Sequence, residues 1–458
     1  MTHLVSCVDF GSTFTKAALV DVDEGALVAA TEHRTTIDTD VLDGWDACLG
    51  ELAARHPGAK HAEVLACSSA GGGLSIAVVG NEELVTAEAG RRVALSSGGK
   101  VVHVASGGLD RTGVTALRQA RPDLVLLVGG TDGGNAEVLL GCATALAKAR
   151  WRGPVVVAGN VEARDDVAAL LDGAGTPYVL ADNVVPRIGV LAPDSARAAT
   201  REMFLRHVIG GKHLSKRADF TAMVRGATPD VVLTAVELLA HGLDEERPGA
   251  GDVAVVDVGG ATTDVHSVVE VDPEDAGLAR QVVASVPVTR TVEGDLGMRW
   301  SAVSTVAEAD RAGLLEPHDR ARLEHAAQRR HAHPGLLPDD EAGRALDREI
   351  ASLAIGVALR RHAGRARVVF GPDGRLVERT GTDLREVDLL VGSGGVLRYG
   401  GGAAAAALTE RLDDSGGWQL PRDPRTVIDI DYVLAPAGLL AGEHPAAAYA
   451  LLRRLFRP

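Results

Sequence analysis

The sequence predicts an α/β protein built from two similar halves, with a ligand cleft between two lobes. Two short glycine-rich segments carry this prediction, residues 8–16 (VDFGSTFTK) and residues 256–264 (VDVGGATTD). Each segment follows one apolar run and precedes another, which is the pattern of a strand, a tight glycine turn and a second strand. Because both halves of the chain carry such a hairpin, we expect a duplicated domain.

The residue types in these hairpins suit phosphate. Glycine adopts positive φ and has no Cβ to block a close approach, while hydroxyl groups and turn N–H groups donate hydrogen bonds to phosphate oxygens. Two such hairpins together indicate a nucleotide held between the halves. The residues expected to cradle its β- and γ-phosphates are Gly11, Ser12, Thr13, Gly259, Gly260 and Thr262.

Two aspartates end the first strands of these hairpins, Asp9 and Asp257. A carboxylate there can hold Mg²⁺ through water, because a charge at the end of an apolar strand needs a partner. Alternatively, each aspartate caps its own turn. Asp257 is also expected to orient the attacking water, since phosphoryl transfer depends on positioning. Lys16 either neutralises phosphate or lies on an exposed strand.

A third glycine-rich segment, residues 387–397, reads as a buried strand that breaks into a turn. The glycines in this turn would let a purine lie against the backbone, and a helix is expected over residues 403–412. The residues expected to bind adenosine are Gly392, Gly394 and Gly395.

Between the two hairpins, short apolar runs alternate with helical patterns. This alternation is typical of parallel strands buried on both faces. After three antiparallel strands over residues 4–34, the expected strands are 62–68, 101–104, 124–128, 154–158 and 178–180, and the expected helices are 40–55, 110–119, 136–149 and 165–172.

The segment 128–135 (VGGTDGGN) follows one of these strands and opens a helix. Helix N-termini after glycine-rich turns favour anions, so Asp132 or Glu137 could hold the hydrolytic water. The alternative, weighed equally, is a tight turn whose Asp or Asn caps the helix.

The polar segment 242–251 marks the expected domain boundary. We expect a first lobe over 1–245, a second lobe over 252–402 with a helical insertion at about 306–350, and a C-terminal helical segment, 403–458, that packs back on the first lobe. Residues 293–297 (EGDLG) either couple the nucleotide to domain closure or form a surface turn. His266 lies in the second hairpin and is rejected as a cobalt ligand.

Composition excludes several classes of function. The chain has 458 residues and a formal net charge of −15, so no electrostatic footprint for nucleic acid is present. No apolar run reaches the length of a membrane span, and the first expected strand begins too early for a signal peptide. Four scattered cysteines predict reduced thiols and a cytoplasmic location.

The order hairpin, hairpin and glycine-rich turn resembles the nucleotide signature shared by actin, sugar kinases and the seventy-kilodalton heat-shock chaperones. This resemblance implies duplicated RNase H-like domains that bind ATP and Mg²⁺. Within that superfamily, the chain resembles the glutamate mutase accessory proteins, called GlmL or MutL, in the segments 9–16, 66–74, 129–135, 257–264 and 291–298.

The closer resemblance implies a reactivating chaperone for an adenosylcobalamin-dependent carbon-skeleton mutase. Such a protein would bind the mutase subunits and couple Mg-ATP hydrolysis to release of damaged cobalamin. Two other functions fit the same fold: a small-molecule kinase with Asp132 as its base, and a scaffold that binds nucleotide without turnover. The sequence leaves the client mutase, the docking surface and the oligomeric state open.

Overall fold

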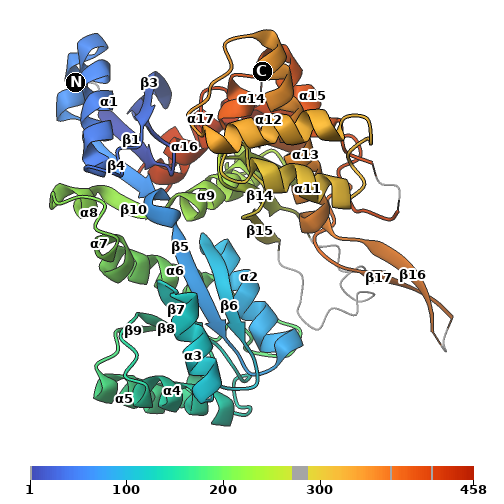
Figure 1. The fold of residues 1–458 in the computed structure, drawn as a ribbon. Helices are drawn as coiled ribbons and strands as arrows, with labels where there is room; N and C mark the ends of the chain where they lie inside the picture. The colour runs from blue at the N-terminus through green and yellow to red at the C-terminus, as the bar shows by residue number, and fades with distance from the viewer. Residues whose placement is uncertain (1–2, 271–286, 372–373, 414–415, 458) are drawn as a thin grey trace. The chain divides into compact units, whose positions relative to one another are not determined.

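The computed structural model describes residues 3–270, 287–371, 374–413 and 416–457 (Figure 1). Contacts divide the chain into two compact units, and the division falls after Leu233, inside helix α9 (Thr228–His241). The polar segment 242–251, where the sequence suggested a boundary, contains the short paired strands β11 (Gly242–Asp244) and β12 (Arg247–Pro248). The expected lobe limits stay a prediction.

The first unit contains a mixed five-stranded sheet in the order β10-β4-β1-β2-β3. Strands β1, β2 and β3 form an antiparallel meander, whereas β4 and β10 run parallel to β1. Helix α1 (Val41–Arg55) packs against β2 and β3. The strands are β1 (Leu4–Phe10), β2 (Phe14–Asp21), β3 (Ala26–Arg34), β4 (Glu63–Ser68) and β10 (Val224–Ala227).

The second unit repeats this sheet in the order β15-β14-β13-β18-β19, with the same strand directions. The hairpin register also repeats, because Asp9 pairs with Lys16 and Asp257 pairs with Asp264. This strand order is that of an RNase H-like domain, so the predicted duplicated, actin-like fold is confirmed. The strands are β13 (Val253–Val258), β14 (Thr263–Val268), β15 (Val288–Glu293), β18 (Leu389–Ser393) and β19 (Arg425–Ile428).

A third sheet lies in the first unit, inserted between β4 and β10. It is fully parallel, in the order β6-β5-β7-β8-β9, which confirms the predicted parallel pairing. The sequence analysis missed strand β5, which lies between β6 and β7 and begins directly after the glycine turn at 71–73. The strands are β5 (Leu74–Val79), β6 (Gly99–Ala105), β7 (Leu124–Leu127), β8 (Val155–Val157) and β9 (Tyr178–Leu180), and the connecting helices are α2 (Glu88–Ser96), α3 (Arg111–Ala120), α4 (Glu137–Lys148) and α5 (Arg164–Ala174).

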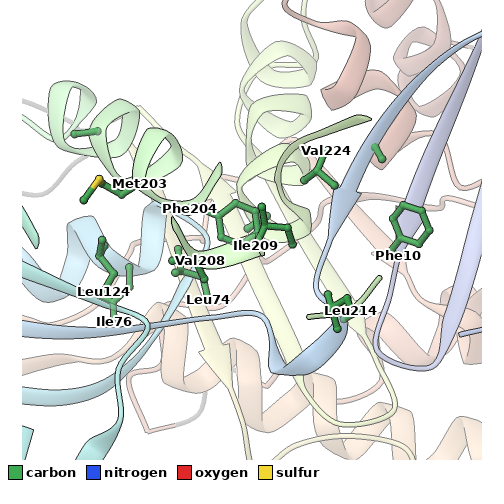
Figure 2. Close-up of a cluster of buried hydrophobic side chains, with 14 of the residues drawn as sticks. Phe10, Leu74, Ile76, Leu124, Met203, Phe204, Val208, Ile209, Leu214 and Val224 are labelled. Atoms are coloured by element: carbon green, nitrogen blue, oxygen red, sulfur yellow. The ribbon is translucent and has the colours of Figure 1, made fainter. Parts of the chain in front are cut away.

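One hydrophobic core connects the first and third sheets (Figure 2). Phe10 of β1 packs edge-on against Phe220, with ring centroids 5.3 Å apart. The same cluster continues through Phe204 to Leu74 and Leu124 of the third sheet. These two sheets therefore belong to a single packed unit even though only one of them carries a glycine-rich hairpin.

Helix α13 (Glu341–Ala363) forms the centre of the core of the second unit. The region of the expected helical insertion contains two further helices, α11 (Ala302–Arg311) and α12 (Arg320–Ala332). Buried Asp347 of α13 binds Arg299 at 3.0 Å and also binds Arg330. On the exposed face, Arg322 is engaged by Asp319 and Glu349, each at 2.7 Å.

The C-terminal helix α17 (Pro445–Phe456) packs against α16 (Leu434–Leu440), β11 and β19. The Tyr449 hydroxyl donates a hydrogen bond to the Pro248 carbonyl at 2.9 Å. These contacts all lie within the second compact unit. Across the described ranges, no helix combines the length and the apolar character that crossing a bilayer requires.

A buried histidine makes the stability of the second unit pH-dependent. His362 lies within hydrogen-bond distance of Ser267 (2.8 Å) and Thr291 (3.1 Å), and burial lowers its pKa to about 4. Burial likewise lowers the pKa of His266. An unfolded chain binds a proton on each histidine below about pH 6.5, so the unfolded state binds more protons than the folded state between pH 6.5 and 4.

We therefore expect the free energy of unfolding to fall as the pH drops from about 6.5 to 4, by up to about 3 kcal/mol for His362. Urea unfolding of His362→Asn should show a shallower pH dependence across this window than the wild type. The exposed His333→Asn variant is the control and should follow the wild-type profile. Equal slopes for wild type and His362→Asn would contradict the assignment.

Candidate functional site

The first hairpin closes on a glycine that no other residue can replace without moving the turn. The Gly11 amide donates to the Phe14 carbonyl at 3.1 Å, and a Cβ at Gly11 would lie 2.6 Å from that oxygen. Thr35 of the segment after β3 braces the turn, because its hydroxyl donates to the Gly11 carbonyl at 2.8 Å. The Thr13 hydroxyl is buried and lacks a hydrogen-bond partner among the described residues. An unpaired donor beside a glycine turn suits an anionic ligand.

Asp9 is the penultimate residue of β1 and is only 4% exposed. Its Oδ1 accepts hydrogen bonds from the Thr228 hydroxyl at 2.5 Å and from the Cys67 thiol at 3.5 Å. Its Oδ2 lies 3.8 Å from the position that a Cβ at Gly11 would take. The carboxylate therefore has one oxygen engaged by neighbouring elements and the other oxygen facing the hairpin.

The second hairpin has the same closure. The Gly259 amide donates to the Thr262 carbonyl at 2.9 Å, and a Cβ at Gly259 would lie 2.9 Å from that oxygen. The Thr262 hydroxyl donates a hydrogen bond to Oδ2 of Asp264 at 3.3 Å. Asp257 stands at the end of β13, half-buried, in the position that Asp9 occupies in β1. Each hairpin thus combines a strand-end carboxylate with a glycine turn and hydroxyl groups.

The segment after β15 binds the second hairpin. Gly297 packs so closely that a Cβ would lie 2.8 Å from the Gly260 and Ala261 carbonyl oxygens. The hydrogen bonds run from Met298 N to Gly259 O (2.9 Å), from Arg299 N and Trp300 N to Gly260 O (2.7 and 2.9 Å), and from Ser301 Oγ to Ala261 O (2.6 Å). Of the two interpretations of residues 293–297, contact with the hairpin is therefore favoured over an independent surface turn. A role in domain closure stays a prediction.

Arg361 of α13 anchors the beginning of this segment. Its guanidinium contacts the carboxylates of Glu293 at 2.7 Å, Asp295 at 2.8 Å and Glu308 at 2.8 Å. Burial raises the pKa of Glu293 despite this partner. Burial also acts to raise the pKa of Asp295, but the hydrogen bond to Arg361 and the positive charges nearby together lower it. The segment that holds the hairpin is therefore fixed to α11 and α13 by charge.

The third glycine-rich turn follows β18 and packs on the end of β13. Gly394 has φ +100°, and a Cβ there would lie 2.2 Å from the Val258 carbonyl oxygen. Gly392 is also closely packed, because a Cβ would meet the ends of three core side chains at 2.8–2.9 Å. At Gly395 a Cβ would meet nothing within 4 Å, so this glycine presents an open backbone face. These contacts fit the expectation that a flat group lies against the turn.

An aromatic and arginine cluster adjoins this turn. The Arg398 guanidinium lies over the rings of Tyr399 (5.4 Å) and Tyr432 (5.1 Å), and its Nε donates to the Ile430 carbonyl at 3.1 Å. Tyr399 and Ile430 are each 64% exposed. The sequence analysis missed this cluster, although Arg398 and Tyr399 follow the glycine turn directly.

Asp132 and Glu137 lie elsewhere in the first unit, at the carboxyl edge of the third sheet. Oδ1 of Asp132 accepts bonds from Val161 N at 3.1 Å and from Asn183 Nδ2 at 2.9 Å, while Glu137 opens α4. Asp123 precedes β7 at the opposite end of this strand, and Gly71 follows β4 of the first sheet. Lys212 Nζ bonds both the Asp123 carboxylate and the Gly71 carbonyl, so this opposite end of β7 is the one that lies near the first sheet. The structure therefore does not bring Asp132 or Glu137 to Asp9. The capping interaction of the alternative interpretation comes from Asn135, whose Oδ1 accepts a hydrogen bond from the Glu137 amide at 2.7 Å.

Gly297 offers a direct test of the hairpin contact. Because a Cβ at Gly297 would overlap two hairpin carbonyls, Gly297→Ala should displace the second hairpin and weaken nucleotide binding about tenfold or more. Gly402→Ala is the control, since a Cβ at Gly402 meets nothing within 4 Å. Titration with a fluorescent ATP analogue measures both variants. Wild-type affinity in a folded Gly297→Ala protein would show that the hairpin does not depend on this contact.

Comparison with known proteins places the chain in a family. Residues 5–456 match the family model described as MutL protein. The chain is 35% identical over 453 residues to Protein MutL of Clostridium tetanomorphum, covering 98% of each protein. Among solved structures, the ethanolamine utilization protein EutJ of Carboxydothermus hydrogenoformans aligns over 99% of this chain and 89% of that one, with 10% identity and a TM-score of 0.28. Gluconate kinase of Lactobacillus acidophilus aligns over 99% and 89%, with 11% identity and a TM-score of 0.32. The fold assignment rests on the strand topology and not on these structural matches. Because the family model and the relative both match nearly the whole chain, the chain belongs to the MutL family.

Proposed function

We propose that this protein is an ATP-dependent reactivating factor for an adenosylcobalamin-dependent carbon-skeleton mutase of the glutamate mutase type. The observation that carries the proposal is the duplicated hairpin, with a strand-end carboxylate and a closing glycine at the same register in both units. Membership of the MutL family supports the mutase as the partner. The proposal includes a cytoplasmic location and no nucleic-acid partner.

The chemistry of both hairpins fits Mg-ATP. Gly11 and Gly259 allow the turns to approach phosphate, and the buried hydroxyl of Thr13 supplies a donor that needs an acceptor. Asp9 and Asp257 would hold Mg²⁺ through its water ligands. When bound, the ion neutralises phosphate charge and orients the phosphates.

The roles within this proposal follow from placement. Asp257, half-buried at the end of β13, orients the attacking water, and Ser12, Gly260 and Thr262 contact phosphate. The proposal gives Asp132 and Glu137 no part in this step, since Asp132 is hydrogen-bonded to Val161 N and Glu137 opens α4. Lys16 stands beside Asp9 in the strand register and is the candidate cation for the phosphates.

The glycine turn after β18 and its neighbouring cluster would hold the adenosine. The open face of Gly395 accommodates a flat base, and Tyr399 offers an exposed ring and Arg398 a guanidinium beside it. Aromatic rings and arginine planes both stack on nucleobases.

Phosphate contacts at the second hairpin can be transmitted through the unit. The carbonyls of Gly259, Gly260 and Ala261 accept bonds from residues 298–301, which lead directly into α11. If the hairpin moves when the γ-phosphate leaves, either residues 298–301 move with it or these hydrogen bonds break. We infer that this is how hydrolysis alters the surface that the mutase contacts.

Asp257→Asn tests the site and the partner together. We expect Mg-ATP turnover that purified mutase subunits stimulate, and a loss of about a hundredfold or more in Asp257→Asn, because the substitution removes the charge that orients water and metal. Asp244→Asn is the control, since Asp244 is exposed and pairs with Arg247. Phosphate release and cobalamin exchange from inactivated mutase are the two measurements.

The outcomes separate the candidate functions. Turnover that rises with a metabolite and ignores the mutase would replace the proposal with a small-molecule kinase. ATP binding without turnover, even beside the mutase, would indicate a nucleotide-gated scaffold. Failure of ATP to accelerate cobalamin exchange would contradict the proposal that the protein is a reactivating factor.

Tyr399→Ala tests the base site. Stacking on an aromatic ring is worth about 1–3 kcal/mol, so the affinity for ATP and for adenosine should fall about tenfold. Competition by tripolyphosphate, which lacks a base, should not change. Leu337→Ala is the control, because Leu337 is also a large exposed apolar residue of the second unit. Equal loss of tripolyphosphate and adenosine binding would contradict a stacking role.

A further inference from the structure

Thr228 is a buried hydroxyl whose partner is the carboxylate of Asp9. Its Oγ1 lies 2.5 Å from Asp9 Oδ1, and the Cys67 thiol reaches the same oxygen at 3.5 Å. Both side chains are buried, with Asp9 4% and Thr228 9% exposed. A hydrogen bond to a buried charged group contributes more than one between neutral groups, because the charge has lost its water.

The sheet register explains why Thr228 reaches Asp9. Strands β1, β4 and β10 are parallel neighbours, so their carboxyl ends lie at one edge of the sheet. Cys67 of β4 stands opposite Asp9, and Ala227 of β10 stands opposite Ser68. Thr228, the next residue and the first of α9, therefore lies at the same edge as the carboxylate.

The hydroxyl bond holds the plane of the Asp9 carboxylate, so that one of its two oxygens faces the hairpin. Since Oδ1 is held by Thr228 and Cys67, Oδ2 lies toward the turn, 3.8 Å from the place of a Cβ at Gly11. If the side chain rotated by half a turn about χ2, the two oxygens would exchange places. Rotation to an intermediate angle would turn both oxygens away from Thr228, which its hydroxyl bond opposes.

The duplicated sheet has a different residue at this place. In the second unit the fifth strand, β19, is followed by Asp429, which is fully buried. Its carboxylate accepts bonds from Val433 N at 2.8 Å and Leu434 N at 3.2 Å, at the start of α16. Asp429 is thus engaged with its own helix, whereas Thr228 turns toward the carboxylate of β1. The two corresponding positions of the duplicated sheets therefore bond to different groups.

We propose that Thr228 is a positioning residue that fixes the Asp9 carboxylate in the orientation that binds the hydrated Mg²⁺ of Mg-ATP. The inference rests on the proposed function, because it assigns Asp9 to magnesium. It adds a residue that contacts neither phosphate nor metal. Cys67 contributes a weaker thiol bond to the same oxygen.

The Mg²⁺ dependence of nucleotide binding tests this role without relying on turnover. With a fluorescent ATP analogue, Thr228→Val should raise the Mg²⁺ concentration for half-maximal binding about tenfold, as expected for loss of a bond to a charged group. Binding at saturating Mg²⁺ should stay within about twofold of wild type. Thr228→Ser restores the hydroxyl and should return the Mg²⁺ requirement to near the wild-type value.

A matched control lies in the same unit. Thr200 of α6 (Asp194–Met203) is fully buried, and its hydroxyl has no hydrogen-bond partner within the described part of the chain. Thr200→Val is the same isosteric change in a buried position, so it should leave the Mg²⁺ requirement unchanged. A tenfold increase in Thr200→Val as well would overturn the specific role of Thr228.

A double-mutant cycle on the nucleotide-free protein gives a second, independent readout. Urea unfolding of Thr228→Val, Asp9→Ala and the double variant should be non-additive, because each single change removes one partner of the same bond. Additive effects, or an unchanged Mg²⁺ requirement in a folded Thr228→Val protein, would overturn the inference and leave the proposed function intact. A wild type that binds no nucleotide at any Mg²⁺ concentration would instead overturn the proposed function.

Discussion

The arrangement of the first unit depends on a carboxylate buried at the end of an apolar strand. Asp9 sits between Val8 and Phe10, both fully buried, and a charge there is costly unless hydrogen bonds replace its lost water. The partners come from β4 and from the start of α9, so strands that meet only in the folded sheet must be in register before the carboxylate is satisfied. The insertion of a complete parallel sheet between β4 and β10 leaves this register intact.

Close backbone contacts place the corresponding groups of the second unit. Gly394 allows the turn after β18 to rest on the Val258 carbonyl, and Gly297 allows its segment to rest on the hairpin. Neither contact accommodates a Cβ, so glycine is required by packing at both positions. The carboxylate of Asp257, the hairpin and the candidate base site are therefore held by strands β13 and β18, which pair in parallel.

The sequence predicts the hairpins because their determinants are local: an apolar strand, an aspartate, glycine and hydroxyl groups within nine residues. The strands β10, β15 and β19 escaped prediction because they are short and mix charged or hydroxylic residues with the apolar ones, as in VTRTVE. The sequence predicts Asp132 as a site residue because a glycine-rich turn between a strand and a helix has the same sequence pattern whether or not it binds an anion. Only the topology shows that its sheet is the inserted one. Thr228 gave no local signal, since its partner is 219 positions away in the sequence.

The second hairpin differs from the first in what holds it, and this difference bears on the proposed function. Thr35, which adjoins β3, braces the first turn, whereas residues 298–301, which directly precede α11, bind three carbonyls of the second. Trp300 and Val303 of this region are 55% and 43% exposed, although the Trp300 amide is bonded to Gly260. A ligand that displaces the second hairpin therefore also displaces the backbone of residues 298–301, and neighbouring side chains of this backbone lie at the surface. A protein that remodels a partner needs a change in the hairpin's position to alter the surface that the partner contacts. The bonds from Gly259, Gly260 and Ala261 to the start of α11 supply that connection.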